Sequence, residues 1–274
     1  MTRRALLVAI GALFLVGGAE GAHLPFTSAL FAAEADADAA PSMDDAWSIA
    51  ELARIARLAR SAARKGGSRA DALNHTVFGE LGFVREVDDP GLEFVFLSQV
   101  LRARRGSCVG LGTLYIALGE MLGWRIDGVM VPGHFFVRLE QGGTSHNIEL
   151  LRKGEEMSDS WYRTRFPGPG RGAAEYGRTL AAREVLGVVE YDVGNARRRE
   201  GRLSEARRAF RLSTSLFPGF AEAHASLGAT EQLLGALDDA LVSYRAARRT
   251  NPDLPGIERN IELLARELDR GARP

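Results

Sequence analysis

The feature that most constrains the fold of this 274-residue chain is a repeat with a period of 34 residues near its C-terminus. Six positions of one segment recur 34 residues later with the same or a similar residue. They are Gly194, Gly201, Leu203, Ala206, Phe210 and Pro218, matched by Gly228, Gly235, Leu237, Ala240, Tyr244 and Pro252. An arbitrary helical bundle does not require a fixed period. The period therefore predicts an all-α domain of stacked helix pairs over residues 181–270.

These positions resemble the tetratricopeptide repeat, a helix-turn-helix unit in which small residues let paired helices approach closely. Two repeats and a final helix, "GIERNIELLAREL", are fewer than the three or more units that such arrays usually need. We therefore expect the array to depend on the domain before it. The resemblance implies a groove that receives a protein or peptide, and the sequence does not identify that ligand.

Residues 1–42 have the pattern of an export signal followed by a flexible stalk. Two arginines precede an apolar run in "MTRRALLVAIGALFLVGG", and small and acidic residues follow it. A membrane span needs about 20 apolar residues, and Glu20 and His23 interrupt this run, so a signal is preferred to a retained N-terminal anchor. We expect an exported protein of the bacterial periplasm or cell envelope. Its single cysteine cannot form an internal disulfide.

An α+β domain is predicted for residues 43–165. Three helical segments precede Cys108, and a fourth, "CVGLGTLYIALGEMLG", begins at it. Three strands follow, in "RIDGVMV", "HFFVRLEQ" and "HNIELL". Helices followed by an antiparallel sheet indicate an α+β architecture. A Gly- and Pro-rich linker at 166–180 should separate this domain from the repeats.

Composition argues against several classes of function. The 35 basic residues balance the 35 acidic ones, which removes a whole-chain electrostatic reason to bind nucleic acid or an acidic membrane. One cysteine and scattered histidines offer no metal-ligand spacing. Because no glycine-rich phosphate loop follows a strand, nucleotide binding is unsupported as well. We expect no cofactor and no metal.

Cys108 lies where a helix is predicted to begin, with Ser107 as its N-cap. A lone cysteine is usually a small buried hydrophobe. At a helix N-terminus, however, unpaired N–H groups and the macrodipole favour the thiolate, and the same N–H groups can hold an oxyanion. Gly110 and Gly112 each cost about 1 kcal/mol of helix propensity relative to alanine, which indicates a close approach of another chain segment or a substrate.

His134 begins an alternating strand, and the following hairpin predicts its neighbours. An even-numbered loop through "QGGTS" places Asn147 and Glu149 on the face of His134, and His146, a rival base, on the other face with Ile148. Either Asn147 or Glu149 could fix the imidazole tautomer. Taken singly, Glu149 could be an ordinary exposed strand acid, and Asn147 a turn or strand-end cap. Gln99, in the preceding helix, is a candidate second oxyanion donor.

Four segments together resemble the transglutaminase-like domain of the SirB type, over about residues 45–165. They are "ALNHTVFGELGF", "VLRARRGSCVGLGTLYIALGEMLGW", "GVMVPGHFFVRLE" and "HNIELLRKGEEMSDSWY". The resemblance implies a papain-like α+β core, often followed by tetratricopeptide repeats, with Cys108 as nucleophile and His134 as base. The third residue of that superfamily is usually an aspartate. Here "NIELL" offers Glu149, with Asn147 as the alternate.

Two functions are therefore consistent with the sequence. The first is an exported cysteine enzyme that acts on amide bonds, by peptide hydrolysis or by acyl transfer to an amine. The second is a non-catalytic protein that binds a peptide or assembles a complex through the transglutaminase-like core and the repeats. The separation of the Cys108 sulfur from the His134 ring would distinguish them.

Overall fold

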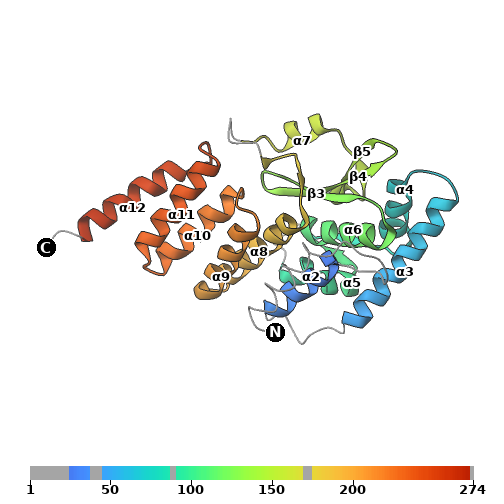
Figure 1. Cartoon of the computed structure of the whole chain (residues 1–274), viewed down its shortest axis with the longest axis horizontal. Coiled ribbons are helices and arrows are strands. Elements are labelled where there is room, and N and C mark those ends of the chain that lie inside the picture. The colour runs from blue at the N-terminus through green and yellow to red at the C-terminus, as the bar shows by residue number, and fades with distance from the viewer. Residues whose placement is uncertain (1–24, 38–44, 87–90, 169–174, 272–274) are drawn as a thin grey trace. The chain divides into compact units, whose positions relative to one another are not determined.

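The structure, a computed structural model, describes residues 25–37, 45–86, 91–168 and 175–271 (Figure 1). The chain divides into two compact units. The first unit comprises the residues up to Phe166 together with Thr179–Ala182, and the second comprises Pro167–Arg178 and the residues from Arg183 onward.

The first unit mixes helices with an antiparallel sheet. Its helices are α2 (Pro25–Asp36), α3 (Asp45–Arg64), α4 (Arg69–Asn74), the π-helix η1 (His75–Glu80), the 3₁₀ helix η2 (Leu92–Phe94), α5 (Leu97–Ala103), α6 (Cys108–Leu122), the 3₁₀ helix η3 (Leu150–Arg152) and α7 (Asp159–Arg165). Its main strands are β3 (Ile126–Val131), β4 (His134–Gln141), β5 (Thr144–Glu149), β6 (Glu155–Glu156) and β7 (Thr179–Leu180), in the sheet order β6-β5-β4-β3-β7. A short parallel pair joins β1 (Val84–Arg85) to β2 (Arg105–Gly106).

Helix α6 is the buried centre of the first unit. Ser107 begins it, since its side chain accepts a hydrogen bond from the Gly110 N–H at 3.1 Å, and Gly123 ends it in the left-handed region. A Cβ added at Gly112 would lie 2.4 Å from the Phe135 ring, and one at Gly119 would lie 2.9 Å from the Ile126 side chain. The close approach that the sequence indicated at Gly112 is therefore made by the sheet.

The two faces of the sheet carry different helices (Figure 1). Phe135 of β4 packs against α6, whereas Phe136, the next residue, belongs to a core cluster with Tyr162 of α7. Alternation along β4 thus separates an α6 face from an α7 face.

Helix α2 corrects the expectation that residues 1–42 are a signal and stalk. Residues 25–36 form a helix whose Phe26 and Leu30 are buried in the first unit. The Glu120 carboxylate of α6 accepts hydrogen bonds from the Phe26 and Thr27 N–H groups at 2.9 and 3.0 Å. An acid at these unpaired donors stabilises the start of the helix. The expected signal itself, residues 1–24, lies outside the described residues.

The interdomain linker also differs from the expectation. Thr179 and Leu180, placed in the linker at 166–180, form β7 at the edge of the main sheet, where Leu180 pairs with Gly128 of β3. Leu180 is buried, so hydrophobic burial and strand pairing attach this segment to the first unit. None of the helices in the described part of the chain combines the length and apolar character that crossing a bilayer requires.

Helices are the regular secondary structure of the second unit in its described residues. It contains α8 (Ala182–Arg199), α9 (Leu203–Leu216), α10 (Ala221–Leu233), α11 (Leu237–Thr250) and α12 (Ile257–Gly271). Helices α9 and α11 begin and end 34 residues apart, as the period predicted. Gly194 faces the Phe210 ring and Gly228 faces the Tyr244 ring, where an added Cβ would lie 2.6 and 2.8 Å away. The same glycine-to-aromatic packing therefore occurs in both helix pairs.

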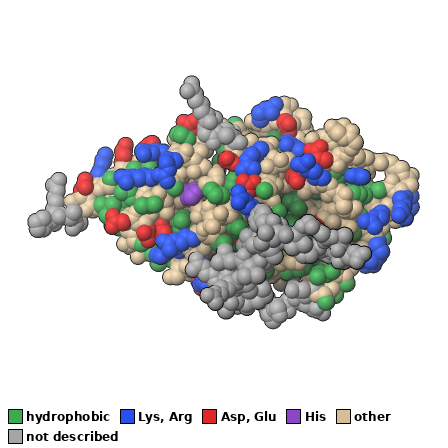
Figure 2. Space-filling model, viewed as in Figure 1, with side chains coloured by type: hydrophobic (Ala, Val, Ile, Leu, Met, Phe, Trp, Pro, Cys, Tyr) green, Lys and Arg blue, Asp and Glu red, His purple; other side chains and the backbone are tan. Residues whose placement is uncertain are grey.

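Charged side chains of both signs are interspersed on the face shown in Figure 2. Within the second unit, Arg202 pairs with Glu205 and Arg211 with Glu231, at 2.5 and 2.8 Å. The basic run "NARRREGR" belongs to the end of α8 and the turn after it, where Arg197 pairs with Glu200 at 2.8 Å. Ion pairing along these helices is in keeping with the balanced composition.

Replacing Glu120 tests the attachment of α2. Glu120→Ala removes the acceptor of two backbone donors and of the Thr27 hydroxyl, so we expect the free energy of unfolding to fall by about 2 kcal/mol. Urea unfolding followed by tryptophan fluorescence reports on the first unit alone, because Trp47, Trp124 and Trp161 all lie in it. Glu120→Gln, which keeps one acceptor, should lose less. Wild-type stability in Glu120→Ala would contradict this account of α2.

Candidate active site

His134 and Glu149 form a buried hydrogen-bonded pair. His134 begins β4 and Glu149 ends β5, and Nε2 of the imidazole lies 2.8 Å from Oε2 of the carboxylate. Each side chain is only 2% exposed. The other carboxylate oxygen, Oε1, accepts the Leu151 N–H at 2.9 Å. The carboxylate is thus held at both oxygens.

The register of β4 and β5 explains why this pair forms. Arg138 pairs with Asn147, which puts the odd-numbered residues of β5 on the face of the even-numbered residues of β4. This is the shared face that the hairpin predicted for His134, Asn147 and Glu149. A carboxylate beside Nε2 accepts the proton carried by that nitrogen, and in this tautomer Nδ1 is the acceptor atom of the imidazole.

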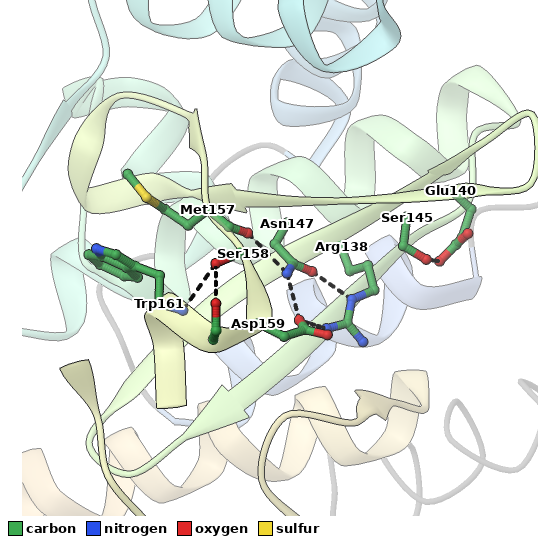
Figure 3. A network of polar contacts seen from close by, with 9 residues as sticks. Arg138, Glu140, Ser145, Asn147, Met157, Ser158, Asp159 and Trp161 are labelled. Atoms are coloured by element: carbon green, nitrogen blue, oxygen red, sulfur yellow. Dashed lines mark hydrogen bonds and ion pairs between the residues drawn. The ribbon is translucent and has the colours of Figure 1, made fainter. Parts of the chain in front are cut away.

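Asn147 contacts other groups than the imidazole (Figure 3). Its Oδ1 accepts from Nε of Arg138 at 2.6 Å, and its Nδ2 donates to Oδ1 of Asp159 at 2.7 Å and to the Met157 carbonyl at 3.1 Å. The Arg138 guanidinium also donates to Asp159, at 2.8 Å. Of the two alternates for the orienting residue, Glu149 is therefore the one that touches His134.

The Arg138–Asn147–Asp159 network attaches α7 to the sheet. It lines a polar cavity of about 510 Å³ together with Ser145, Glu156, Met157 and Ser158. Asn147 is 7% exposed, so its amide needs these partners.

His146, the rival base, is separated from His134 as the strand parity predicted. It pairs with Leu139, on the face of Ile148, and its Nδ1 lies 3.0 Å from both carboxylate oxygens of Glu156 on β6. Its side chain is more exposed than that of His134, at 20% against 2%.

Cys108 lies at the same end of the domain as the His134–Glu149 pair. Helix α6 runs along β4, since Gly112 packs on Phe135 at the start of that strand and Gly119 packs on Ile126, the partner of Leu139. Cys108 is one helical turn, about 5–6 Å, before Gly112. It therefore lies toward the end of the sheet at which β4 begins and β5 ends.

Cys108 and His134 begin two elements that pack on each other, α6 and β4. Cys108 is half-buried at the start of α6, and His134 alternates with Phe135, so its side chain is on the α7 face. Gln99 lies half-buried within α5. Contact between Cys108 and His134, and an oxyanion role for Gln99, stay predictions.

Two aromatic residues of α7 and its end cover the imidazole, and the sequence reasoning missed them. The Phe166 ring is stacked on the His134 ring with centroids 4.5 Å apart, and Tyr162 stacks on Phe136 at 3.7 Å. Burial and the nearby Glu149 carboxylate raise the pKa of the Tyr162 phenol, so it stays protonated. Tyr162 lies four residues after the Ser158 N-cap, and Phe166 lies four residues after Tyr162. This helical spacing is the sequence signal that could have placed the Tyr162 and Phe166 rings on one face.

No group of three or more His, Cys, Asp or Glu residues in the described ranges is arranged to hold a metal ion.

A comparison with protein families identifies the first unit. The model of the transglutaminase-like superfamily matches residues 46–186, which is just over half of the 274-residue chain. The chain belongs to the transglutaminase-like superfamily. The matched range of this transglutaminase-like domain includes Cys108, His134 and Glu149 and continues through β7. The fold is thus a transglutaminase-like core of helices and antiparallel sheet, followed by further helices.

Curated relatives match only part of this transglutaminase-like chain. A UPF0162 protein of Vibrio cholerae is 34% identical over 102 residues, which are 35% of this chain and 37% of that protein. UPF0162 proteins from two strains of Xylella fastidiosa are 38% identical over 71 residues, or 25% of either chain. The matches span well under two thirds of these relatives.

The polar network predicts a stability effect at Asn147. Asn147→Ala leaves Nε of Arg138 and one Asp159 contact without their amide partner, so we expect the free energy of unfolding to fall by about 2 kcal/mol. Ser145→Ala is the matched control, because Ser145 lines the same cavity but bonds only at the surface, to Glu140. It should change stability by less than about 0.5 kcal/mol. Equal losses in urea unfolding would contradict the structural role of the network.

Proposed function

We propose that this chain is an exported cysteine enzyme that acts on amide bonds, either hydrolysing a peptide or transferring its acyl group to an amine. Cys108 is the nucleophile, His134 the base and Glu149 the residue that orients the imidazole. The observation that carries the proposal is the buried 2.8 Å contact between His134 and Glu149, which occurs at the end of the domain toward which Cys108 lies. Asn147, the alternate, has a structural role instead.

The proposed reaction proceeds in two steps. The Cys108 thiol gives its proton to Nδ1 of His134, and the resulting thiolate attacks the amide carbon while N–H groups at the start of α6 hold the oxyanion. The C–N bond then breaks as His134 passes that proton to the departing amine. His134 then takes a proton from water or from a second amine, which attacks the thioester carbon and releases the thiolate. Water yields hydrolysis and an amine yields transfer.

The helix N-terminus and the oriented imidazole supply the two requirements of this chemistry. The Ser107 cap leaves the first N–H groups of α6 directed toward the start of the helix, where Cys108 lies. Glu149 fixes Nε2 as the protonated nitrogen and so makes Nδ1 the basic one.

We assign the transglutaminase-like domain to the SirB type and the second unit to tetratricopeptide repeats that bind a protein or peptide. The 34-residue period and the repeated packing of Gly194 on Phe210 and Gly228 on Tyr244 support the repeat assignment. The arginines and apolar run of residues 1–18 support export to the periplasm or cell envelope.

One observation favours a second function, that of a non-catalytic binding protein. The His134 and Glu149 side chains are each 2% exposed, a degree of burial that also suits a purely structural pair. In that case the domain and the repeats would together hold a peptide or assemble a complex.

Acylation by an activated ester separates the two functions. With p-nitrophenyl acetate, the enzyme should release a burst of nitrophenolate and carry one acetyl group on Cys108, as seen by intact-protein and peptide mass spectrometry. Cys108→Ser should abolish the adduct, and His134→Ala should slow acylation by at least about a hundredfold. Faster turnover on adding glycine methyl ester, with acetylated amine as product, would identify transfer. Acylation at other residues only, or equal rates in His134→Ala, would contradict the enzyme.

A further inference from the structure

The cover over His134 is more specific than general core packing. The Phe166 and His134 rings are inclined by only 15° with centroids 4.5 Å apart, a stacked pair. Tyr162 also lies nearly parallel to the imidazole, at 6.4 Å and 20°. Phe166 is only half-buried, yet the imidazole that it stacks on is 2% exposed.

This arrangement bears on the hydrogen bond between His134 and Glu149. A hydrogen bond screened from water is electrostatically stronger than one that water competes for. A ring stacked flat on the imidazole also opposes rotation about its Cβ–Cγ bond, which is otherwise a broad torsion. The side chain that supplies both effects on the α7 face is Phe166, held there by its N–H bond to the Tyr162 carbonyl at 2.8 Å.

We infer that Phe166 is a positioning residue for the proposed reaction: it screens the Nε2–H···Glu149 hydrogen bond from water and fixes the plane of the imidazole. It acts through His134. The inference rests on the proposed function, because a fixed imidazole matters for catalysis only if His134 serves Cys108.

Other residues near the imidazole fit this role less well. Trp161 contacts Tyr162 and Phe166 at ring distances of 5.0 and 6.1 Å, both edge-on. Its relation to the imidazole is thus indirect, which makes it a matched control from the same cluster. The charged groups around the pair are Glu149 itself on β5 and, farther along the same face, Arg138 and Asp159.

Solvent exchange of the His134 Nε2 proton tests the inference without using activity. In the full chain labelled with ¹⁵N-histidine, that proton should be visible by NMR and exchange slowly, and its assignment follows from its loss in His134→Gln. In Phe166→Ala it should exchange at least about tenfold faster, because the bond then opens to water. Phe166→Tyr should keep the wild-type rate, and so should Trp161→Ala.

Phe166→Leu covers the case in which Phe166→Ala does not fold. It keeps apolar volume but not the flat ring, so the inference expects exchange between the rates of the alanine variant and the wild type. Tryptophan fluorescence checks the fold of each variant. Wild-type exchange in both Phe166→Ala and Phe166→Leu would overturn the inference, as would a wild-type proton that already exchanges like that of an exposed imidazole.

Alkylation of Cys108 at pH 7 then distinguishes the two proposals. If both hold, iodoacetamide reacts more slowly in Phe166→Ala and in His134→Ala, and at the wild-type rate in Phe166→Tyr. If exchange responds to Phe166 while His134→Ala leaves alkylation unchanged, the proposed function fails and Phe166 serves only the buried pair. If alkylation depends on His134 but not on Phe166, the positioning role fails alone.

Discussion

The close packing of α6 on the sheet is the constraint from which the site follows. Gly112 and Gly119 lack the Cβ atoms that would strike Phe135 and Ile126, so the helix can lie directly along β4. That contact fixes the direction of α6 relative to the strands and sets Cys108 toward the end where His134 begins β4 and Glu149 ends β5. Two glycines that weaken the helix locally are therefore what brings its N-terminus toward a buried histidine–carboxylate pair.

Burial on the opposite face completes the pair. Phe166 and Tyr162 exclude water from the imidazole, and the Arg138–Asn147–Asp159 network fixes α7, which carries Tyr162, to β4 and β5. Asn147 and Glu149 are two residues apart on one face of β5 and yet have different partners, because Arg138 is directly opposite Asn147. A single strand thus provides both a structural amide and a candidate orienting carboxylate.

Sequence patterns were sufficient wherever a short-range rule applied. Strand parity predicted that His134 and Glu149 share a face, and cap chemistry predicted the start of α6 at Cys108. The 34-residue period predicted the spacing of α9 and α11. Side chains alternate every two residues along a strand, a cap acts within one helical turn, and the helix pairs recur every 34 residues. Spacing along the sequence is therefore enough to predict each of these features.

Features that depend on distant residues were not predictable in this way. Helix α2 was mistaken for stalk because its apolar residues surround the helix, leaving no polar face, and its capping acid, Glu120, is more than 90 residues away. Strand β7 is two residues long and exists only because β3 offers an open edge. The choice between Glu149 and Asn147 depended on Arg138 and Asp159, which no spacing rule connects to them.

The claim that Cys108, His134 and Glu149 act together is tested by the rate of Cys108 alkylation against pH in the wild type, His134→Ala and Glu149→Gln. If thiol, imidazole and carboxylate act as a unit, wild-type reactivity persists well below about pH 8.5, where an unperturbed thiol titrates, and both variants lose this low-pH reactivity. Identical profiles in all three proteins, each rising near that pH, would contradict the claim and leave Cys108 as a structural thiol at the start of α6.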